Sequence, residues 1–325
     1  MCTAVSYRTK DHYFGRNLDL DFSYDEKVTI CPRNFEIKFA NTGSIKNYYA
    51  MIGMATIVDN YPLYYDATNE KGLSMAGLNF PDNAYYRKLE KGRENIATYE
   101  FILWILSQCS SVKEARVLCG KMNLTNQAFS EKFPVSTLHW IIADKDESIV
   151  VESVREGIKI YDNPVGVLTN NPPFDVQLFN LNNYRHLSST IGPNLFSKEL
   201  ELKEYSRGMG GVGLPGDLSS MSRFVRASFV KLNSVSGDGE VESISQFFKI
   251  LDSVAQQKGL CLVGESNEYE FTIYSSCVNT TKGIYYYTTY ENSQISAVDM
   301  NKEDIESFDL ISYPLITGQQ INHQN

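Results

Sequence analysis

The order in which strand-like and helix-like stretches follow each other is the feature that most constrains this fold. Apolar and polar residues alternate through much of residues 1–90, which predicts strands, and the first two, at 2–7 and 13–18, are expected to form a hairpin around the polar turn 8–11. Helical spacing follows at 99–108, and a Ser-x-x-Glu capping box at 111–114 opens a second helix that runs toward residue 122. The chain therefore changes from strands to helices after about its first third.

The remaining segments repeat these two types in turn. Strands are expected at 48–58, 63–67, 73–78, 136–143, 148–153, 157–161, 165–169, 269–275, 283–290 and 294–299, and helices at 222–232 and 243–255. This order is typical of the α+β class, in which antiparallel sheets stack and helices cover their outer faces. No repeat, low-complexity tract or linker divides the 325 residues, so we expect a single domain over 1–325.

Charge and composition exclude several kinds of partner. The formal net charge is −9, and the 30 Lys and Arg residues are scattered, which disfavours nucleic acid and anionic membranes as partners. No apolar stretch is long enough for a membrane-spanning helix, and the N-terminus lacks the basic and apolar regions of a signal peptide. We therefore expect a cytoplasmic protein that binds neither nucleic acid nor membranes.

Metal and cofactor chemistry has little support in the sequence. The six cysteines are far apart and form no C-x-x-C pair, and the four histidines show no H-E-x-x-H spacing. The glycine-rich run at 207–213 superficially resembles a phosphate-binding loop, but no strand leads into it and no helix directly follows. We therefore expect neither a metal nor a cofactor.

Cysteine occupies the second position of the chain, directly after Met1. Removal of that methionine would leave Cys2 with a thiol, whose ordinary pKa is about 8.5, and an α-amine, whose ordinary pKa is about 7.7–8.0. At neutral pH this amine can accept the proton of the thiol, so one residue combines a nucleophile with its base. Taken alone, a cysteine at position two can equally be an accident of sequence, and other residues have to decide.

Charged residues on the second predicted strand are the first of these. Strand alternation places Cys2 and Ala4 on one face of the first strand, and Arg16 and Leu18 on one face of the second. Arg16 beside the thiol would favour the thiolate, and Asp19 could hold the terminal amine. A regular strand puts residues 16 and 19 on opposite faces, so a shared site predicts a bulge or bend near Leu18. An ordinary surface ion pair is the alternative interpretation.

Seven short blocks, in order along the chain, carry a family resemblance. They are Met-Cys-Thr at 1–3, Phe-Gly-Arg-Asn-Leu-Asp at 14–19, Ala-Gly-Leu-Asn-Phe-Pro at 76–81, Val-Leu-Thr-Asn-Asn-Pro at 167–172, Gly-Leu-Pro-Gly-Asp at 213–217, Ser-Arg-Phe at 222–224 and Tyr-Thr-Thr-Tyr-Glu-Asn at 287–292. With them the chain resembles, nearly from end to end, the bile salt (choloylglycine) hydrolases, which are N-terminal-nucleophile hydrolases. The resemblance implies a four-layer αββα sandwich with two stacked antiparallel sheets.

The resemblance also implies a catalytic set. Cys2 would be the nucleophile, Asp19 and Arg16 would orient its amine and thiol, and the Asn170 side chain and the Asn79 backbone N–H would form the oxyanion hole. Together with a third charged group, the implied set is Cys2, Arg16, Asp19, Asn79, Asn170 and Arg223. The implied reaction is hydrolysis of the amide bond of glycine- or taurine-conjugated bile salts through a thioester, without metal or cofactor.

Substrate contacts and assembly follow from the same resemblance. An apolar pocket for the steroid would be lined by Leu20, Tyr24, Ile57, Tyr65, Phe129 and Leu138. A homo-tetramer is expected. Penicillin V acylases share the catalytic set and, with related acyl-amide amidases of the same family, are the nearest alternative, although penicillin V acylases commonly carry tyrosine at the position of Asn79. An alternative of another class is a non-catalytic binder of steroids or acyl amides, in which a retained Met1 blocks Cys2.

Overall fold

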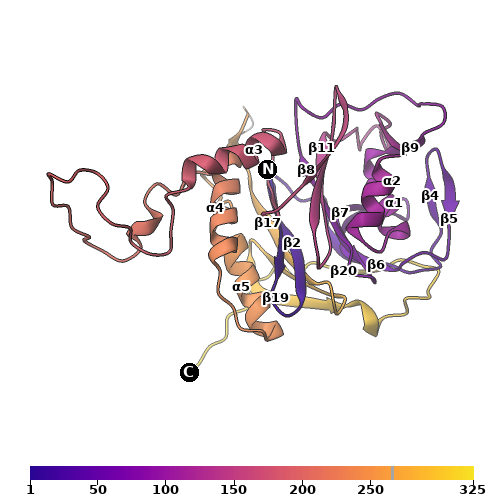
Figure 1. The fold of residues 1–325 in the computed structure, drawn as a ribbon. Coiled ribbons are helices and arrows are strands. Elements are labelled where there is room, and N and C mark those ends of the chain that lie inside the picture. The colour runs from indigo at the N-terminus through magenta and orange to yellow at the C-terminus, as the bar shows by residue number, and fades with distance from the viewer. Residues whose placement is uncertain (265–266) are drawn as a thin grey trace.

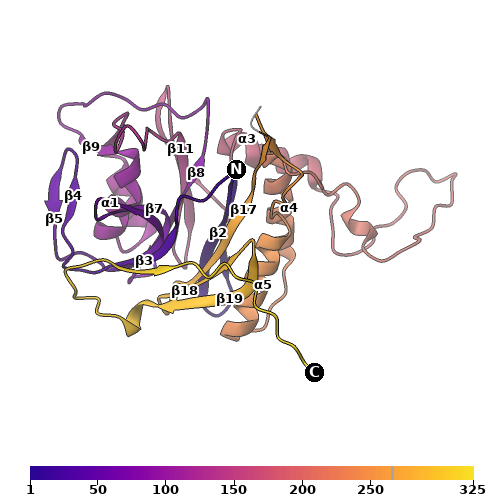
Figure 2. The same ribbon diagram turned by 180° about the vertical axis from the view of Figure 1, so that it is seen from behind.

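Two large antiparallel sheets are stacked between helices in the computed structural model, which describes residues 1–264 and 267–325. Figures 1 and 2 show the four layers, with α1 and α2 outside one sheet and α4 and α5 outside the other. The α+β class and the αββα arrangement expected from the sequence are therefore confirmed.

The smaller of the two sheets contains the chain's N-terminal strand, which lies next to an edge strand. Its six strands are, in spatial order, β14 (Val167–Leu168), β1 (Cys2–Arg8), β2 (His12–Leu20), β17 (Phe271–Asn279), β18 (Ile284–Thr289) and β19 (Asn292–Asp299). The predicted hairpin is confirmed, because β1 and β2 pair in antiparallel register from Cys2 opposite Leu18 to Arg8 opposite His12. Gly15 lets β2 and β17 approach closely, since a Cβ atom there would lie 1.9 Å from the Ser276 carbonyl oxygen.

The larger sheet has eight strands, and all of its neighbouring pairs are antiparallel. In spatial order they are β13 (Gly157–Asp162), β12 (Ser148–Val154), β11 (Leu138–Ala143), β8 (Ser74–Asn79), β7 (Tyr61–Asn69), β6 (Met51–Val58), β3 (Lys27–Cys31) and β20 (Ile311–Pro314). Three pairs of short strands lie outside these sheets: β4 (Ile37–Phe39) with β5 (Gly43–Ile45), β9 (Glu94–Ala97) with β10 (Met122–Thr125), and β15 (Leu262–Val263) with β16 (Glu268–Tyr269).

Five α-helices of the described residues complete the layers. They are α1 (Phe101–Gln108), α2 (Val112–Cys119), α3 (Phe174–Asn180), α4 (Ser220–Asn233) and α5 (Glu240–Asp252). Seven of the eight residues of α1 are buried, and the capping serine predicted at Ser111 accepts a hydrogen bond from the Glu114 N–H at the start of α2. Short 3-10 segments lie at Thr98–Glu100, Leu181–Tyr184, Met209–Gly211 and Met300–Lys302.

Two apolar clusters hold the layers together. One lies between the sheets and under α4 and α5, and includes Phe14, Leu78 and Phe247. The other lies between the eight-stranded sheet and α1 and α2, and includes Trp104 and Trp140. Burial of these fully enclosed side chains contributes about 1.5–3 kcal/mol each to folding.

Some boundaries differ from the prediction. The second predicted helix ends at Cys119, because the chain turns into β10 at Met122. The strand predicted at 165–169 is reduced to β14, Val167–Leu168, because Gly166 adopts a positive φ of 62° just before it. The prediction did not include α3 or the strands β3 and β20.

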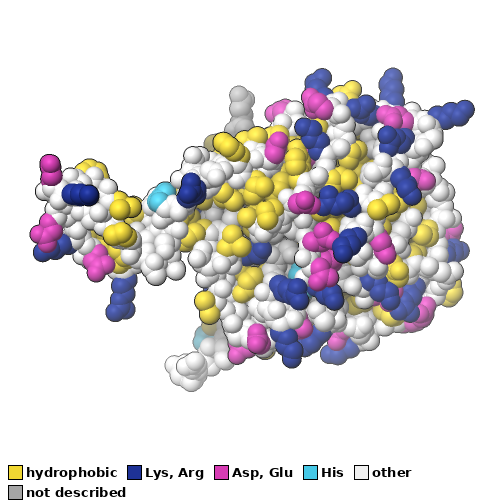
Figure 3. Space-filling model, viewed as in Figure 1, with side chains coloured by type: hydrophobic (Ala, Val, Ile, Leu, Met, Phe, Trp, Pro, Cys, Tyr) yellow, Lys and Arg dark blue, Asp and Glu magenta, His cyan; other side chains and the backbone are white. Residues whose placement is uncertain are grey.

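A long loop projects away from the layers between the 3-10 segment Leu181–Tyr184 and α4 (Figure 1). Figure 3 shows hydrophobic side chains along this projection. Its exposed apolar residues are Ile191, Leu195, Phe196, Leu200, Leu202, Tyr205 and Val212. Such a set of side chains outside the globular body indicates a contact surface.

Candidate active site

Cys2 begins β1 and is 3 % exposed. Cross-strand partners share a face of a sheet, so the pairs Cys2 with Leu18 and Ala4 with Arg16 place the thiol on the same face as Arg16, as predicted. Met1 precedes Cys2 in this structure. The Met1 ammonium donates to the Asp19 main-chain oxygen at 2.7 Å and pairs with the Glu270 carboxylate at 2.6 Å.

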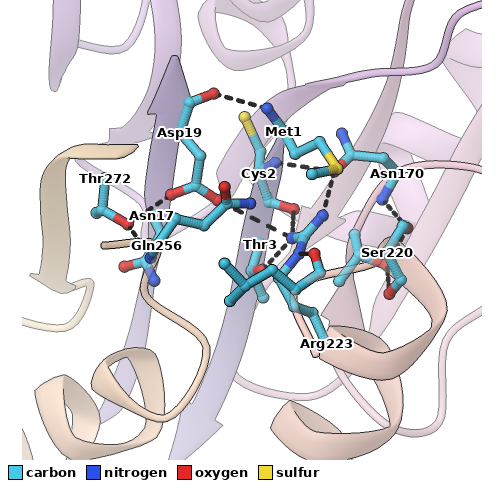
Figure 4. Close-up of polar contacts among 12 residues, drawn as sticks. Met1, Cys2, Thr3, Asn17, Asp19, Asn170, Ser220, Arg223, Gln256 and Thr272 are labelled. Atoms are coloured by element: carbon cyan, nitrogen blue, oxygen red, sulfur yellow. Dashed lines mark hydrogen bonds and ion pairs between the residues drawn. The ribbon is translucent and has the colours of Figure 1, made fainter. Parts of the chain in front are cut away.

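Asn170 links the Cys2 main chain to a second strand end (Figure 4). Its side-chain oxygen accepts the Cys2 N–H at 2.8 Å and an N–H of Arg223 at 2.8 Å. Its Nδ2 group donates to the main-chain oxygen of Asn79 at 2.7 Å. The Asn170 amide is therefore held in one orientation, because its oxygen and its nitrogen both make hydrogen bonds. Its Nδ2 points to the end of β8, where Asn79 lies.

Arg223 reaches this group from α4 and is fully buried. Its Nη1 donates to the Cys2 carbonyl at 2.5 Å and to the Thr3 hydroxyl at 2.7 Å, and it lies 4.0 Å from Asp19 Oδ2. Burial lowers the pKa of this guanidinium, and the negative charge of Asp19 opposes that effect. The ion partner of Asp19 is therefore Arg223.

The start of α4 fixes where Arg223 can lie. Asp217 accepts hydrogen bonds from the Ser219 N–H at 2.9 Å and the Ser222 hydroxyl at 2.6 Å, which lowers the pKa of Asp217 to about 2. The Arg223 Nε donates to the Leu218 carbonyl at 2.9 Å. The turn that opens the helix thus also orients its functional side chain.

Asp19 is held by a hydroxyl from β17. The Thr272 hydroxyl donates to Asp19 Oδ1 at 2.7 Å, and Thr272 itself accepts the Gln256 N–H at 2.8 Å. Burial raises the pKa of Asp19, while Arg223, the terminal ammonium and the Thr272 hydrogen bond act to lower it. Among the described residues, Asp19 Oδ2 has no hydrogen-bond partner.

Arg16 belongs to a different buried group, between the two sheets. Its Nη1 donates to the main-chain oxygens of Tyr65 at 2.9 Å and Gly77 at 2.6 Å. Burial acts to lower the pKa of Arg16, but electrostatic coupling to the acidic groups of Cys2, Tyr274 and Asp66 exceeds this effect and raises it. Arg16 is therefore a permanent cation next to the Cys2 thiol.

The predicted bend near Leu18 lies in the neighbouring strand. β2 runs unbroken from His12 to Leu20, so Arg16 and Asp19 lie on opposite faces and the bend expected in this strand is wrong. The register shift occurs in β17, where Thr272 pairs with Asp19 and Tyr274 pairs with Leu18. The extra residue is Ile273, which makes this a β-bulge opposite the predicted position.

Half of the predicted substrate-binding residues lie in a connected group. The Thr56 hydroxyl contacts the Tyr65 hydroxyl at 2.9 Å and donates to the Tyr24 carbonyl at 3.0 Å. The Phe133 ring lies 6.4 Å from that of Tyr24 and 6.3 Å from that of Phe129. These contacts link three of the predicted residues through Thr56 and Phe133, which the sequence did not single out.

The other three predicted substrate residues differ in their surroundings. Leu20, at the end of β2, packs against the apolar cluster between the sheets. Ile57 is partly buried in β6. Leu138 pairs with Asn79 and packs against the cluster under α1 and α2, which lies on the other face of the eight-stranded sheet from the Cys2 side.

Three residues at the site had no signal in the sequence. Gln256 and Glu270 come from the segment between α5 and β17, and Thr272 comes from β17 itself, all far from Cys2 along the chain. A threonine in a strand or a glutamine in a loop is ordinary, so neither type marks a site. In residues 1–264 and 267–325, no three His, Cys, Asp or Glu side chains gather where they could hold a metal, and no helix is long and apolar enough to cross a membrane.

Comparisons with known proteins agree with this geometry. Residues 2–313 match the family of linear amide C–N hydrolases described as the choloylglycine hydrolase family. The chain is 58% identical to a bile salt hydrolase/transferase of Lactiplantibacillus plantarum, over 98% of both chains. It is 41% identical to a bile salt hydrolase/transferase of Clostridium perfringens over 100% of both, and 36% identical to a conjugated bile acid hydrolase of Lactobacillus acidophilus over 96% of this chain and 100% of that one.

Solved structures give the same result. A mutant of the conjugated bile acid hydrolase from Clostridium perfringens superposes with a TM-score of 0.92, at 40% identity and over 100% of both chains. A penicillin V acylase from Agrobacterium tumefaciens shares the fold, with a TM-score of 0.73 at 21% identity over 96% of this chain and 90% of that one. Fold and site thus define a hydrolase with an N-terminal nucleophile. The chain belongs to the choloylglycine hydrolase family and is a hydrolase of linear amides.

Proposed function

We propose that this protein hydrolyses the amide bond of glycine- or taurine-conjugated bile salts, with Cys2 as the nucleophile. The observation that carries the proposal is the Cys2–Asn170–Arg223 contact group, which lies in a chain 58% identical to a bile salt hydrolase/transferase. The buried thiol, the adjacent guanidinium of Arg16 and the oriented amide of Asn170 are the groups that thiol-dependent amide hydrolysis needs.

The first half of the reaction forms a thioester. Once Met1 is removed, the nitrogen of Cys2 is a primary amine beside the Asn170 oxygen, and it accepts the thiol proton. The thiolate attacks the amide carbonyl, and the resulting oxyanion receives hydrogen bonds from Asn170 Nδ2 and the Asn79 N–H. The C–N bond then breaks as the ammonium of Cys2 returns the proton to the leaving nitrogen, which departs as glycine or taurine.

The second half releases the bile acid. A water molecule gives a proton to the free α-amine of Cys2 and attacks the thioester carbonyl through the same oxyanion hole. Collapse of this intermediate breaks the C–S bond, and the proton returns to the thiolate. Arg16 stabilises the thiolate in both halves, and Asp19 with Arg223 holds the amine in place.

Product analysis tests the substrate class. We expect purified protein to release glycine or taurine from conjugated bile salts, and to release phenoxyacetic acid from penicillin V much more slowly. Turnover of penicillin V alone would make the protein an acylase. Binding of bile salts without turnover, together with an intact mass that includes Met1, would support the non-catalytic binder.

Acyl transfer to an amine is a second candidate activity, favoured by the names of the relatives from Lactiplantibacillus plantarum and Clostridium perfringens. A thioester can be attacked by an amine instead of water, with the same oxyanion hole. We expect added amino acids to yield new bile acid conjugates in competition with hydrolysis, measured by mass spectrometry. A constant hydrolysis product yield at saturating amine would exclude this route.

We further propose a single domain over 1–325 that forms a homo-tetramer in the cytoplasm. The projecting loop supports assembly, because its apolar side chains include Phe196 and Tyr205, exposed by 81% and 83%. Light scattering is expected to give four times the monomer mass. Replacing Leu195 and Phe196 by serine is expected to lower that mass, and cell fractionation tests the location.

The steroid site is proposed from the connected aromatic group. Tyr24, Tyr65 and Phe129 support it, because Thr56 and Phe133 bring them together. We keep Leu20 and Ile57 in the proposal as the predicted remainder of the lining. Leu138 stays in the proposal only as the cross-strand neighbour of Asn79, because its side chain packs on the other face of the sheet. Alanine at Phe129 is expected to raise KM for bile salts more than it lowers kcat.

A further inference from the structure

A buried histidine–glutamate pair lies behind the proposed oxyanion hole. His139 of β11 and Glu152 of β12 are both 0% exposed, and His139 Nδ1 lies 3.0 Å from Glu152 Oε1. His139 Nε2 lies 2.8 Å from the Thr169 carbonyl oxygen. The imidazole stacks on Phe80, with ring centres 4.2 Å apart and planes 5° apart. Neither residue takes part in the chemistry described above.

The contacts determine where the protons of this pair lie. A carbonyl oxygen can only accept, so His139 Nε2 carries a proton toward Thr169. The Nδ1–Oε1 contact holds one more proton, whether it is drawn on the imidazole or on the carboxyl group. Glu152 Oε1 also accepts the Phe174 N–H at 3.0 Å. The pair therefore links β11 and β12 to the Thr169 carbonyl and the Phe174 N–H.

Two contacts of His139 lead directly to the proposed oxyanion donors. Thr169, held by His139 Nε2, immediately precedes Asn170. Phe80, stacked on the imidazole, immediately follows Asn79. His139 itself pairs across the sheet with Leu78, the residue before Asn79. The imidazole thus lies between the chain segments that supply the two donors.

We propose that His139 and Glu152 are positioning residues that fix the Asn79 and Asn170 donors relative to each other. This inference rests on the roles given to Asn79 and Asn170 under the proposed function. A donor displaced from the developing negative charge stabilises it less, and loss of one complete donor costs about 10²–10³ in rate. A misplaced donor costs part of that.

A second buried histidine, His12, provides a matched control for substitution of His139. His12 is also buried, at 2% exposure, but its ring nitrogens contact the hydroxyls of Ser6 and Thr280, both at 2.9 Å. It lies at the start of β2, where it pairs with Arg8, whereas Cys2 pairs with Leu18 near the other end of the strand. Substitution of His12 therefore measures the general cost of losing a buried histidine.

Two variants separate the contacts of His139. The amide nitrogen of glutamine reaches about the position of Nε2, so His139→Gln keeps the donor to Thr169. The amide nitrogen of asparagine reaches about the position of Nδ1, so His139→Asn keeps the contact to Glu152 and loses that to Thr169. Glu152→Gln is the further variant, because an amide cannot maintain all three contacts of the pair at once.

Three measurements on folded protein test the proposal: kcat and KM for a glycine-conjugated bile salt, the burst of p-nitrophenol when p-nitrophenyl acetate acylates Cys2, and the rate of Cys2 alkylation by iodoacetamide. Acylation forms an oxyanion, whereas alkylation at a saturated carbon does not. In His139→Asn we expect kcat and the burst rate to fall about 10- to 100-fold, with KM and the alkylation rate within about twofold of the wild type.

The remaining variants complete the test. His139→Gln is expected to recover acylation to within about threefold of the wild type, Glu152→Gln to slow it, and His12→Asn to leave it unchanged. An equal fall in acylation and alkylation in His139→Asn, or no fall in acylation, would overturn the proposal. If wild-type protein shows the burst but releases no glycine, the substrate proposal fails while the positioning test still stands.

Discussion

Two buried arginine–aspartate groups lie on opposite faces of β2, and they differ in what surrounds the carboxylate. Between the sheets, Asp66 accepts the hydroxyls of Tyr274 and Tyr285, each at 2.8 Å, near Arg16. On the helix side, Asp19 accepts a single hydroxyl, from Thr272, and keeps one oxygen without a hydrogen-bond partner in the described chain. A buried carboxylate whose oxygens all accept hydrogen bonds serves structure. A buried carboxylate with one oxygen left without a partner is available for chemistry.

The two groups act on different atoms of Cys2. The group between the sheets faces the thiol, and the group on the helix side faces the main-chain nitrogen, through Arg223 and Asn170. One residue therefore receives separate electrostatic environments for its nucleophile and its base.

The largest expected effect concerns Cys2 itself. Cys2→Ala is expected to lose more than about 10³-fold in kcat, because the proposed nucleophile that forms the acyl-enzyme is lost. Cys277→Ala is the matched control, because Cys277 is buried in the same sheet and burial raises its pKa well above the ordinary value. Steady-state hydrolysis rates check both variants. Substantial turnover by Cys2→Ala would show that Cys2 is not the nucleophile, and the two arginine–aspartate groups would then have no separate roles at it.

The two arginines are expected to fail in different ways. Arg16→Met is expected to slow iodoacetamide alkylation of Cys2 at neutral pH about tenfold, since the cation beside the thiolate is lost. Arg223→Met is expected to lower kcat about 100-fold, because the amine loses its orientation, and to change alkylation less. Identical profiles for the two variants would mean that the two groups act as one.

The free energy of unfolding tests the ion pair between Arg223 and Asp19 separately from catalysis. Removing Arg223 alone leaves the Asp19 carboxylate buried without its ion partner, which is expected to lower the free energy of unfolding by about 3–5 kcal/mol. The double variant Arg223→Met with Asp19→Asn is expected to recover most of that loss without recovering activity. Urea denaturation measures the first effect, and a double variant with wild-type turnover would contradict the second.

A smaller effect is expected at Thr272. Its hydrogen bond acts to lower the pKa of Asp19, so Thr272→Val raises that pKa further. Asp19 then becomes protonated at higher pH, and the acidic limb of kcat/KM moves upward by about 1 pH unit, equivalent to about 1.4 kcal/mol. Thr272→Ser keeps the hydroxyl and is expected to restore the wild-type profile. A downward shift would refute the assignment.

Ser276 is the counterpart of Thr272 on the other face and is expected to matter least. Its hydroxyl accepts the Arg16 N–H at 3.1 Å and lies 3.4 Å from Asp66 Oδ2, which already has two tyrosine donors. Ser276→Ala is expected to cost about 1 kcal/mol of stability and leave the pH profile unchanged. If Ser276→Ala shifts the acidic limb of kcat/KM as far as Thr272→Val does, then Asp19 and Asp66 do not differ in their role in catalysis.

Local patterns were sufficient to predict the N-terminal hairpin and the shared face of Cys2 and Arg16, because both follow from the two-residue period of a strand. The partner of Asp19 could not be found in this way. Arg223 lies on a helix more than 200 residues away, and the nearer Arg16 was the natural choice from spacing. Contacts of this kind depend on how layers pack, which no local period contains.

The bulge illustrates the same limit. The segment Phe271-Thr272-Ile273-Tyr274 contains only residues that favour strands, with no glycine to mark an irregularity. We predicted an irregularity near Leu18 because Arg16 and Asp19 were expected to share a site. The irregularity lies at that level of the sheet, but in the facing strand β17.

Ile273 has a consequence for how this strand can change in length. With the extra residue, Thr272 and Ser275 both face the helix side, where they meet Asp19 and Asn17, while Tyr274 meets Asp66 on the other side. Deleting Ile273 would restore a regular ladder in which Thr272 still lies opposite Asp19 and Tyr274 opposite Leu18. Inserting one residue elsewhere in β17 would instead exchange the two faces for every residue beyond it, so Ile273 is a residue that this strand can lose without changing which side chains meet Asp19 and Asp66.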